Sequence, residues 1–265
     1  MTTGRTTPMD ADTLARLFDL SDRTAIVTGG TRGIGRFTAE GFVAAGANVV
    51  VASRKADACT ETAADLNAIG RGRAIGVPAH LGDLDDVARI VSVAAAEFGR
   101  IDIVVNNAAN ALTQPIGEFT PEAWDKSFAV NMKGPTFLIQ AALPALEATG
   151  NGSIINVISA GAFLQSSFVA MYAAAKAAMM SFTRSFAAEL APRGIRVNAL
   201  APGTVDTDMT RANGVEAADR MAKASPMGRA AHPDEMVGPM LFLASDASSF
   251  MTGQVLLVDG GLTPH

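Results

Sequence analysis

Short apolar runs along the chain alternate with longer segments in which apolar residues recur at helical spacing. The runs predict strands at residues 24–28, 48–52, 74–78, 101–105, 153–158, 196–200 and 254–258. The longer segments predict helices at residues 33–45, 56–69, 84–98, 121–148 and 166–191. Strands that are apolar throughout and separated by helices are typical of a parallel sheet covered on both faces. We therefore predict an α/β fold with a doubly wound, seven-stranded parallel sheet in a single domain.

The regions outside the predicted elements bear on domain organisation. Residues 1–20 precede the first strand and form an N-terminal extension. Residues 21–265 show no linker or internal repeat, so we expect one domain with a variable substrate loop at about 204–231. Residues 150–175 carry no charge and are long enough to span a bilayer. Because polar residues and glycines interrupt them, we expect a strand, a loop and the start of a helix there.

Composition argues against several classes of partner. The chain has 265 residues, 49% of them hydrophobic, and a net charge of −5, the wrong sign for a nucleic-acid or anionic membrane surface. Its one cysteine, Cys59, allows no intrachain disulfide, and the three histidines lack the spacing of a metal site. The N-terminus lacks the apolar core of a signal peptide. We expect a cytoplasmic protein that binds a small molecule and does not bind nucleic acid, membrane or metal.

The first predicted strand runs into a glycine-rich turn, residues 28–35, with the sequence TGGTRGIG. Glycine is needed where the backbone passes close to a pyrophosphate. The helix that begins near Gly33 directs its free N–H groups and positive dipole end at the phosphates. A glycine-rich turn without a ligand is the alternative, but the position between a first strand and a helix favours dinucleotide binding.

The spacing TGGTRGIG departs from the GxGxxG of larger dehydrogenases and resembles the TGxxxGxG motif of the short-chain dehydrogenase/reductase family. The resemblance covers about residues 23–261. Its further motifs follow in order: Asn106-Asn107-Ala108-Ala109, Asn131, Ser159, Tyr172-Ala-Ala-Ala-Lys176, Asn198, Pro202-Gly203 and Asp259-Gly260-Gly261. Each motif is weak alone, but their order on the predicted elements is specific. The resemblance implies a Rossmann-like fold and an NAD(P)-dependent oxidoreductase that interconverts a ketone or aldehyde and an alcohol.

The resemblance also implies a cofactor site around the catalytic pair Tyr172 and Lys176. Its other members are Gly29, Thr31, Arg32, Gly33, Ile34 and Gly35 of the turn, Ser53 and Arg54 after the second strand, His80 and Leu81 after the third, Asn107 and Ala108 after the fourth, and Pro202, Gly203, Val205 and Thr207 after the sixth. His80 stands where the family usually has Asp or Asn, so a plain loop histidine is an equal alternative.

The residue at the end of the second strand decides between NADP(H) and NAD(H). An acid there would bind the adenosine ribose and repel a 2′-phosphate. The chain has Ser53 at this position, followed by Arg54, and Arg32 could approach the same phosphate. A charge-assisted bond from arginine to phosphate is worth about 1.5–3 kcal/mol. We predict NADP(H) as the preferred cofactor, with NAD(H) as the alternative if both arginines are only solvated surface charges.

Tyr172 and Lys176 lie four residues apart on one predicted helix, so their side chains share a face. A free phenol has a pKa of about 10 and is a poor base at neutral pH. An ammonium group about 5 Å away stabilises phenolate by about 3 kcal/mol at an effective dielectric constant of about 20. We expect this pair to make Tyr172 the general acid and base. In the family that the motif resembles, the lysine also holds the nicotinamide ribose.

Ser159 and Asn131 complete the expected catalytic set. Ser159 follows the fifth strand, at the edge where doubly wound sheets bind ligands, and its hydroxyl could polarise a carbonyl oxygen. Asn131 resembles the family residue that holds a water molecule between the lysine and solvent. Taken singly, each of the four residues would more often be structural. Tyr172 is the only tyrosine of the chain and stands beside Lys176, so the set together favours catalysis.

The substrate is expected against residues 110–112, 160–164 and about 208–231. These segments supply Ala111, Leu112, Ala162, Phe163, Leu164, Met209, Met221 and Met227. Such side chains suit a small-to-medium apolar ketone or secondary alcohol, or else pack among themselves. No fixed cation is evident for a carboxylate, although Arg211 or Arg229 could be recruited.

Other functions and the assembly follow from the same resemblance. A 3-oxoacyl carrier-protein reductase needs a basic docking patch, of which only Arg193 remains. A non-catalytic nucleotide-sensing protein on this scaffold would be expected to have lost Tyr172, Lys176 or Ser159. Enoyl reduction normally shows a wider Tyr-to-Lys spacing than the three alanines found here. The long helices at 121–148 and 166–191 predict a homotetramer.

Overall fold

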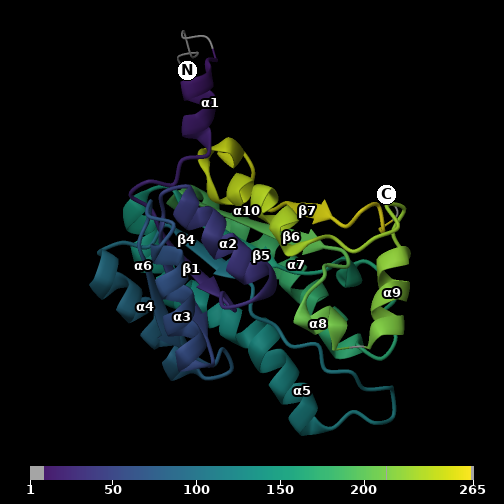
Figure 1. The fold of residues 1–265 in the computed structure, drawn as a ribbon. Coiled ribbons are helices and arrows are strands. Elements are labelled where there is room, and N and C mark those ends of the chain that lie inside the picture. Colours follow the sequence, from purple (N-terminus) through teal and green to yellow (C-terminus); the bar gives the residue numbers. More distant parts are fainter. Residues whose placement is uncertain (1–8, 213, 264–265) are drawn as a thin grey trace.

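The core of the protein is a seven-stranded parallel sheet, seen in a computed structural model that describes residues 9–212 and 214–263 (Figure 1). The strand order is β3-β2-β1-β4-β5-β6-β7. The strands are β1 (Thr24–Thr28), β2 (Asn48–Ser53), β3 (Ala74–Pro78), β4 (Ile103–Asn106), β5 (Gly152–Val157), β6 (Ile195–Pro202) and β7 (Val255–Val258). The predicted fold class is therefore confirmed. The order reverses between β1 and β4, the point where open α/β sheets bind ligands at the strand carboxyl ends.

Helices cover both faces of the sheet, because alternate residues of each strand point to opposite sides. One layer contains α2 (Gly33–Ala44), α3 (Ala56–Asn67) and α10 (Val237–Ala244), and packs on residues such as Val27 and Val51. The other contains α4 (Leu84–Phe98), α6 (Gly134–Thr149) and α7 (Ala170–Leu190), and packs on residues such as Ile26 and Val50. The sequence pattern does not predict α10, because its residues, VGPMLFLA, include no polar face that would give a helical period.

The predicted helix at 121–148 is interrupted where Asn131 stands. The segment forms α5 (Pro121–Phe128), a π-helical turn (Ala129–Lys133) and α6. Pro135, in the first turn of α6, has no N–H to donate to the carbonyl group four residues earlier, which favours a wider turn at this point. The predicted helix at 166–191 begins only at Ala170, where α7 starts.

The N-terminal extension contains a short helix, α1 (Ala11–Leu17), capped by the Asp10 side chain. In Figure 1 this helix stands away from the sheet and its covering layers. The chain joins the body at Leu20, which is completely buried. The predicted extension also includes residues 1–8, which lie outside the described residues. In the part of the chain that is described, no helix has both the length and the apolar character needed to cross a membrane.

The predicted substrate loop at about 204–231 follows β6. It contains α8 (Asp208–Arg211) and α9 (Val215–Lys223), neither of which the sequence pattern predicts. Its two ends are joined by a parallel bridge between Val205 and Ala231, and Asn213 within it lies outside the described residues. The loop therefore leaves and rejoins the body at one place, beside the carboxyl end of β6.

Candidate active site

The glycine-rich turn between β1 and α2 has a backbone that other residues would strain. Gly29 and Gly33 have φ angles of +64° and +53°, in the left-handed region that favours glycine. A Cβ atom at Gly35 would lie 2.4 Å from the Gly29 carbonyl oxygen and 2.4 Å from Asn107 Nδ2. The turn is therefore packed too tightly for side chains at these positions.

The first turn of α2 has unsatisfied hydrogen-bond donors. Its N-cap residue, Arg32, has an extended backbone and makes no side-chain cap, so the free N–H groups of the helix lack the usual intramolecular acceptor. Such an uncapped helix end beside a glycine turn is a ready site for phosphate oxygens. Together with the glycine backbone, this fits the pyrophosphate of a dinucleotide.

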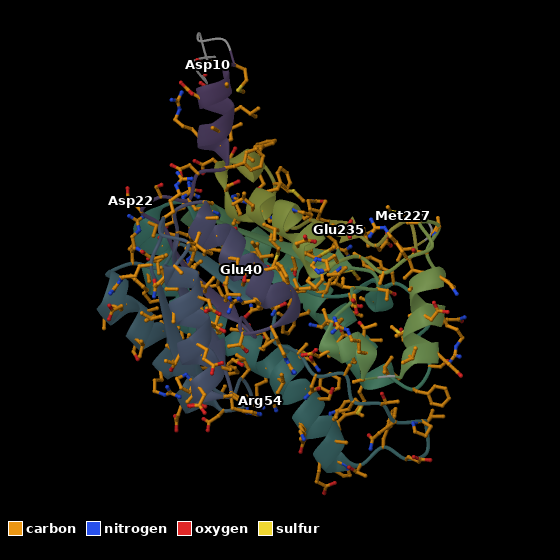
Figure 2. All side chains as sticks on the ribbon, viewed as in Figure 1. Asp10, Asp22, Glu40, Arg54, Met227 and Glu235 are labelled. Atoms are coloured by element: carbon orange, nitrogen blue, oxygen red, sulfur yellow. The ribbon has the colours of Figure 1, made fainter. Side chains whose placement is uncertain are left out.

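The residues expected to choose between the two cofactors lie at the end of β2. The hydroxyl groups of Thr31 and Ser53 are 3.0 Å apart, so the turn and β2 are brought together there. Arg54 is exposed at the rim of the molecule (Figure 2), and no described residue forms an ion pair with it. Arg32 lies 3.5 Å from the Asp208 carboxylate, with both side chains largely exposed. Arg54 is thus available to an anion, whereas Arg32 would have to leave Asp208.

The residues expected beside the adenosine follow β3 and β4. Asn107 donates its amide N–H to the Thr28 carbonyl at 2.9 Å and to that of Gly29 at 3.2 Å, so its side chain holds the glycine turn. Ala108 N–H donates to the Thr28 hydroxyl. Leu81 is buried, while exposed His80 accepts a bond from Gly82 N–H at Nδ1. His80 is therefore engaged in its own loop.

The segment after β6 also reaches the glycine turn. Pro202 is the last residue of β6, and Gly203 lies so close to Asp259 that a Cβ atom would be 2.7 Å from the Asp259 Cα. Val205 is buried. The methyl group of Thr207 lies 3.2 Å from the position that a Cβ atom would take at Gly33. The fold thus brings the cofactor residues predicted after β6 to the same edge as the turn.

Tyr172 and Lys176 lie on α7, with the Lys176 Nζ atom 5.5 Å from the centre of the Tyr172 ring. Lys176 is buried, and its ammonium group donates to the Val157 carbonyl at 2.7 Å. Burial without a counter-charge lowers the pKa of Lys176 to about 8. The amine therefore remains mostly protonated at neutral pH.

The pKa of the Tyr172 phenol moves in the direction opposite to our expectation. Burial raises it, and a hydrogen bond with the Ser159 side chain opposes that change by stabilising the phenolate. The Lys176 ammonium was expected to lower this pKa, but in this structure it is directed at Val157. Desolvation of the phenol is therefore the larger effect.

Ser159 lies just past β5 and caps a short 3₁₀ turn (Ala160–Ala162), where its hydroxyl accepts from Gly161 N–H at 3.1 Å. Asn131 is buried in the π-helical turn. Its amide donates to the Asn110 carbonyl at 2.8 Å, and its oxygen accepts from Asn110 N–H at 3.1 Å. The Asn131 side chain therefore holds the loop after β4, a link that the sequence did not indicate.

Sequence reasoning also missed a buried polar chain behind the site. The Asn106 amide donates to the Asn156 oxygen, and the Asn156 amide donates to the Thr183 hydroxyl, both at 2.9 Å. These bonds connect β4, β5 and α7. Asn106 belongs to the motif at residues 106–109 and Asn156 stands in a mostly apolar strand, but neither signal indicates that their side chains bond to each other.

The expected substrate segments expose apolar side chains. Phe163, Met209 and Met221 are about two-fifths exposed, and Met227 is 62% exposed, so they do not simply bury one another. The two arginines considered for a carboxylate are already paired: Arg211 with Asp206 at 2.8 Å and Arg229 with Glu235 at 2.7 Å. The Arg229 guanidinium lowers the pKa of Glu235 to about 2.

Comparisons with known proteins agree with this geometry. Residues 29–263 match a protein-family model described as enoyl-(acyl carrier protein) reductase. L-rhamnose 1-dehydrogenase (NAD(P)(+)) of Azotobacter vinelandii is 38% identical over 250 residues, which cover 92% of this chain and 97% of that protein. Human dehydrogenase/reductase SDR family member 4 is 36% identical over 257 residues, covering 96% and 92%. The structure of a 3-oxoacyl (acyl-carrier-protein) reductase from Agrobacterium tumefaciens C58, with NADP bound, has a TM-score of 0.87 at 36% identity and covers 94% of this chain and 97% of that one. The chain therefore belongs to the short-chain dehydrogenase/reductase family and is an NAD(P)-dependent oxidoreductase that acts on CH–OH groups.

Proposed function

We propose that the protein interconverts a ketone or aldehyde and an alcohol with NADP(H), on small-to-medium apolar substrates, with Tyr172 as general acid and base. The observation that carries the proposal is the position of the buried Lys176 ammonium one helical turn from Tyr172, whose phenol interacts with Ser159 at the end of β5. A proton donor, a hydroxyl group and a fixed positive charge thus meet at the carboxyl edge of the sheet.

The roles of the side chains follow from their donors. When bound at the glycine turn, NADPH would supply the hydride that the carbonyl carbon receives. The Ser159 hydroxyl donates to the substrate oxygen and stabilises the negative charge that develops there. Tyr172 donates its phenolic proton to that oxygen, and the nearby Lys176 ammonium stabilises the phenolate that remains. Asn131 holds the loop after β4 through Asn110, and by family resemblance supports proton exchange with solvent.

The proposed preference for NADP(H) rests on charge at the end of β2. Ser53 brings no negative charge beside the adenosine ribose, and Arg54 is free of ion pairs with the described residues. The uncapped first turn of α2 would hold the pyrophosphate. NAD(H) remains the alternative cofactor, because none of these features excludes it.

The variant Tyr172→Phe tests the mechanism. It removes only the hydroxyl group, so we expect kcat for ketone reduction to fall by about 10²–10⁴-fold. NADPH binding, followed by its fluorescence, should change little and thereby show that the protein is folded. Turnover equal to that of the wild type would contradict the role of Tyr172. If the wild type reduces no ketone in a panel, the proposed activity as a whole is contradicted.

Two other activities deserve a direct comparison. Reduction of a 3-oxoacyl carrier protein would need a basic docking surface, but Arg193 is paired with Glu147. Enoyl reduction is the activity named by the family model, whereas the three-residue spacing between Tyr172 and Lys176 supports carbonyl reduction. NADPH oxidation with a 3-oxoacyl thioester, an enoyl thioester and a simple ketone would separate the three. A nucleotide-sensing protein without turnover would oxidise NADPH with none of them.

We further propose a cytoplasmic homotetramer. The support for assembly is apolar surface on the long helices, where Trp124 of α5 is 48% exposed and Phe137 of α6 is 39% exposed. Burying such side chains against another subunit would remove them from water. A monomer in light scattering at micromolar concentration would contradict the tetramer.

A further inference from the structure

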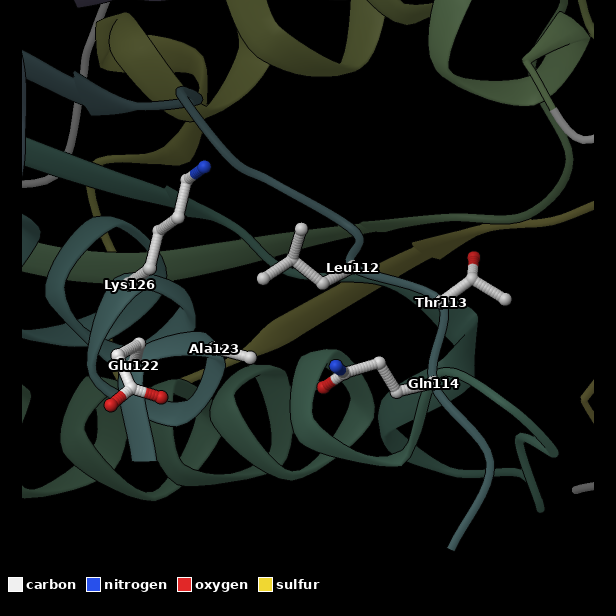
Figure 3. A pocket seen from close by; sticks show the side chains of 6 residues that line it. All are labelled: Leu112, Thr113, Gln114, Glu122, Ala123 and Lys126. Atoms are coloured by element: carbon white, nitrogen blue, oxygen red, sulfur yellow. The ribbon is translucent and has the colours of Figure 1, made fainter. Parts of the chain in front are cut away.

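A cavity of about 340 Å³ opens between the loop that follows β4 and helix α5 (Figure 3). Its lining consists of Leu112, Thr113, Gln114, Glu122, Ala123 and Lys126. The volume is at the lower end of the range for small-molecule sites, about 300–1,000 Å³. None of the residues assigned to the dinucleotide lines it, and four of its six lining residues have polar side chains. It is therefore a candidate for a part of the substrate other than the reacting carbonyl.

The cavity is joined to the proposed catalytic residues through the backbone. Gln114 N–H donates to the Phe168 carbonyl at 2.7 Å, four residues before Tyr172. At the start of the same loop, the Asn110 amide donates to the Lys126 carbonyl at 3.2 Å. Helix α5 itself packs against α7. The cavity thus lies between the segments that lead to Tyr172 and Asn131.

The side chain of Gln114 has hydrogen-bonding groups without partners. Its Oε1 atom is buried with no donor near it, and within the described residues no acceptor meets its Nε2 atom. Figure 3 shows the Gln114 amide extended across the cavity toward Ala123. The buried Oε1 is an acceptor and needs a donor such as water, whereas Nε2 is not buried and keeps its N–H groups available to a ligand in the cavity. Its N–H groups are suited to an acceptor such as a carboxylate oxygen.

Lys126 is the second donor at this cavity. Glu122 lies one turn earlier on α5, a spacing that usually favours an ion pair. Figure 3 shows the two side chains pointing in different directions, and within the described residues no carboxylate lies within 4 Å of the Lys126 ammonium. Arg211 and Arg229, in contrast, are both paired. Lys126 is therefore a cation near the substrate segments that is free to meet an anion.

We infer that this cavity binds the carboxylate of a substrate that carries its reacting ketone or alcohol at some distance, with Lys126 as the cation and Gln114 as the hydrogen-bond donor. The inference rests on the proposed function, since the carbonyl end of the same molecule would meet Ser159 and Tyr172. It extends the substrate range beyond purely apolar compounds, to oxo acids and hydroxy acids with an apolar middle.

The test compares 4-oxocyclohexanecarboxylate with its methyl ester, which has the same ketone but no charge. Isothermal titration into protein saturated with NADP⁺ measures binding without turnover, because that complex has no hydride to donate. Lys126→Met should weaken binding of the acid about ten-fold and that of the ester less than two-fold. Gln114→Leu should weaken acid binding about three- to five-fold. The preference for the acid should shrink in 0.5 M NaCl.

Arg73→Met is the control, because it likewise removes one positive charge, at an exposed position outside the segments assigned to cofactor or substrate, where Arg73 is paired with Glu97. It should leave the affinities for acid and ester unchanged. Equal weakening of acid and ester by Lys126→Met, unchanged acid binding in that variant, or no binding of the acid to the wild type would each overturn the inference. Failure of the proposed function is distinguished from all of these, because it would appear as absent NADPH oxidation with the ester.

Discussion

The nucleotide half of the site and the substrate half are built by different means. In the nucleotide half, backbone atoms determine the geometry: Gly35 lies against the Gly29 carbonyl, and the Asn107 amide holds the turn. In the substrate half, side chains such as Phe163 and Met227 are exposed, and the loop at about 204–231 leaves and rejoins the body beside the Val205–Ala231 bridge.

This difference indicates which residues of each half tolerate substitution. A backbone packed at contact distance admits almost no side chain, so substitutions there should cost both folding and cofactor binding. Exposed side chains contribute little to folding and are free to determine which substrate fits. The contrast leads to four predictions, which range from the tightest part of the site to the most exposed.

The largest effect is expected from Gly35→Ala. The added Cβ atom would lie 2.4 Å from both the Gly29 oxygen and Asn107 Nδ2, so the turn has to move. We expect a loss of about 2–4 kcal/mol in the free energy of unfolding and at least a 100-fold weaker affinity for NADPH. Urea unfolding and fluorescence titration measure the two quantities. Glu40→Ala, on the same helix, removes only a partly buried ion pair with Arg36 and should change stability by less than about 1 kcal/mol. Equal losses of stability and of NADPH affinity in the two variants would contradict the claim that the glycine turn tolerates less change than the rest of the helix.

Lys176→Met should raise the free energy of unfolding while it lowers the activity. Burial lowers the pKa of Lys176 from its ordinary 10.5 to about 8, which amounts to about 3 kcal/mol of unfavourable burial. The variant removes that cost but loses the bond to Val157, so at pH 7 we expect it to be about 1–3 kcal/mol more stable and nearly inactive.

The pH dependence provides the check on that prediction. The unfolded wild type binds a proton that the folded protein lacks between pH 8 and 10.5, so wild-type stability rises relative to the variant across this window. The advantage of Lys176→Met should therefore be full below pH 8 and shrink as the pH approaches 10.5. Urea unfolding at pH 7, 8.5 and 10 measures it, and a constant difference would contradict the buried-charge explanation.

Ser53→Asp is expected to act on cofactor choice, with little effect on folding. A carboxylate at the end of β2 would repel the 2′-phosphate of NADPH, so kcat/KM with NADPH should fall about 10–100-fold relative to NADH. Ser92→Asp adds the same charge at an exposed position on α4 and serves as the control. An unchanged NADPH to NADH ratio in Ser53→Asp would show that the 2′-phosphate is not bound near β2.

The same contrast explains which features the sequence predicted. Strand positions and the glycine turn follow from local patterns, so the seven strands, the fold class and the place of Gly29, Gly33 and Gly35 were predictable. The helix α10 was missed, because its residues are apolar throughout and so give no periodic alternation of apolar and polar positions. The π-helical turn at Asn131 was also missed, because Pro135 indicates that the helix is disturbed at this point but not whether it kinks, breaks or widens.

The sequence predicts which residues belong to the site better than it predicts where their side chains point. Sequence spacing places Tyr172 and Lys176 on one face, but not the bond from Lys176 to the Val157 carbonyl, which comes from a neighbouring strand. The Gln114 amide and the Lys126 ammonium have no side-chain partner among the described residues, and this likewise depends on how a loop lies against α5. Such features arise from tertiary packing, which spacing along one element does not determine.

The smallest effect is expected at Phe168, in the loop before α7. This residue is 60% exposed and has a φ angle of +65°, which is unfavourable for a bulky side chain. Asparagine adopts this conformation more readily, so Phe168→Asn should raise the free energy of unfolding by up to about 1 kcal/mol. Phe163→Asn makes the same replacement at a φ of −110° and should lower it slightly, because contacts are lost without any relief of strain. Urea unfolding of both variants decides the point. If both variants lower the free energy of unfolding equally, the backbone at Phe168 is unstrained, and the loop before α7 stores no strain.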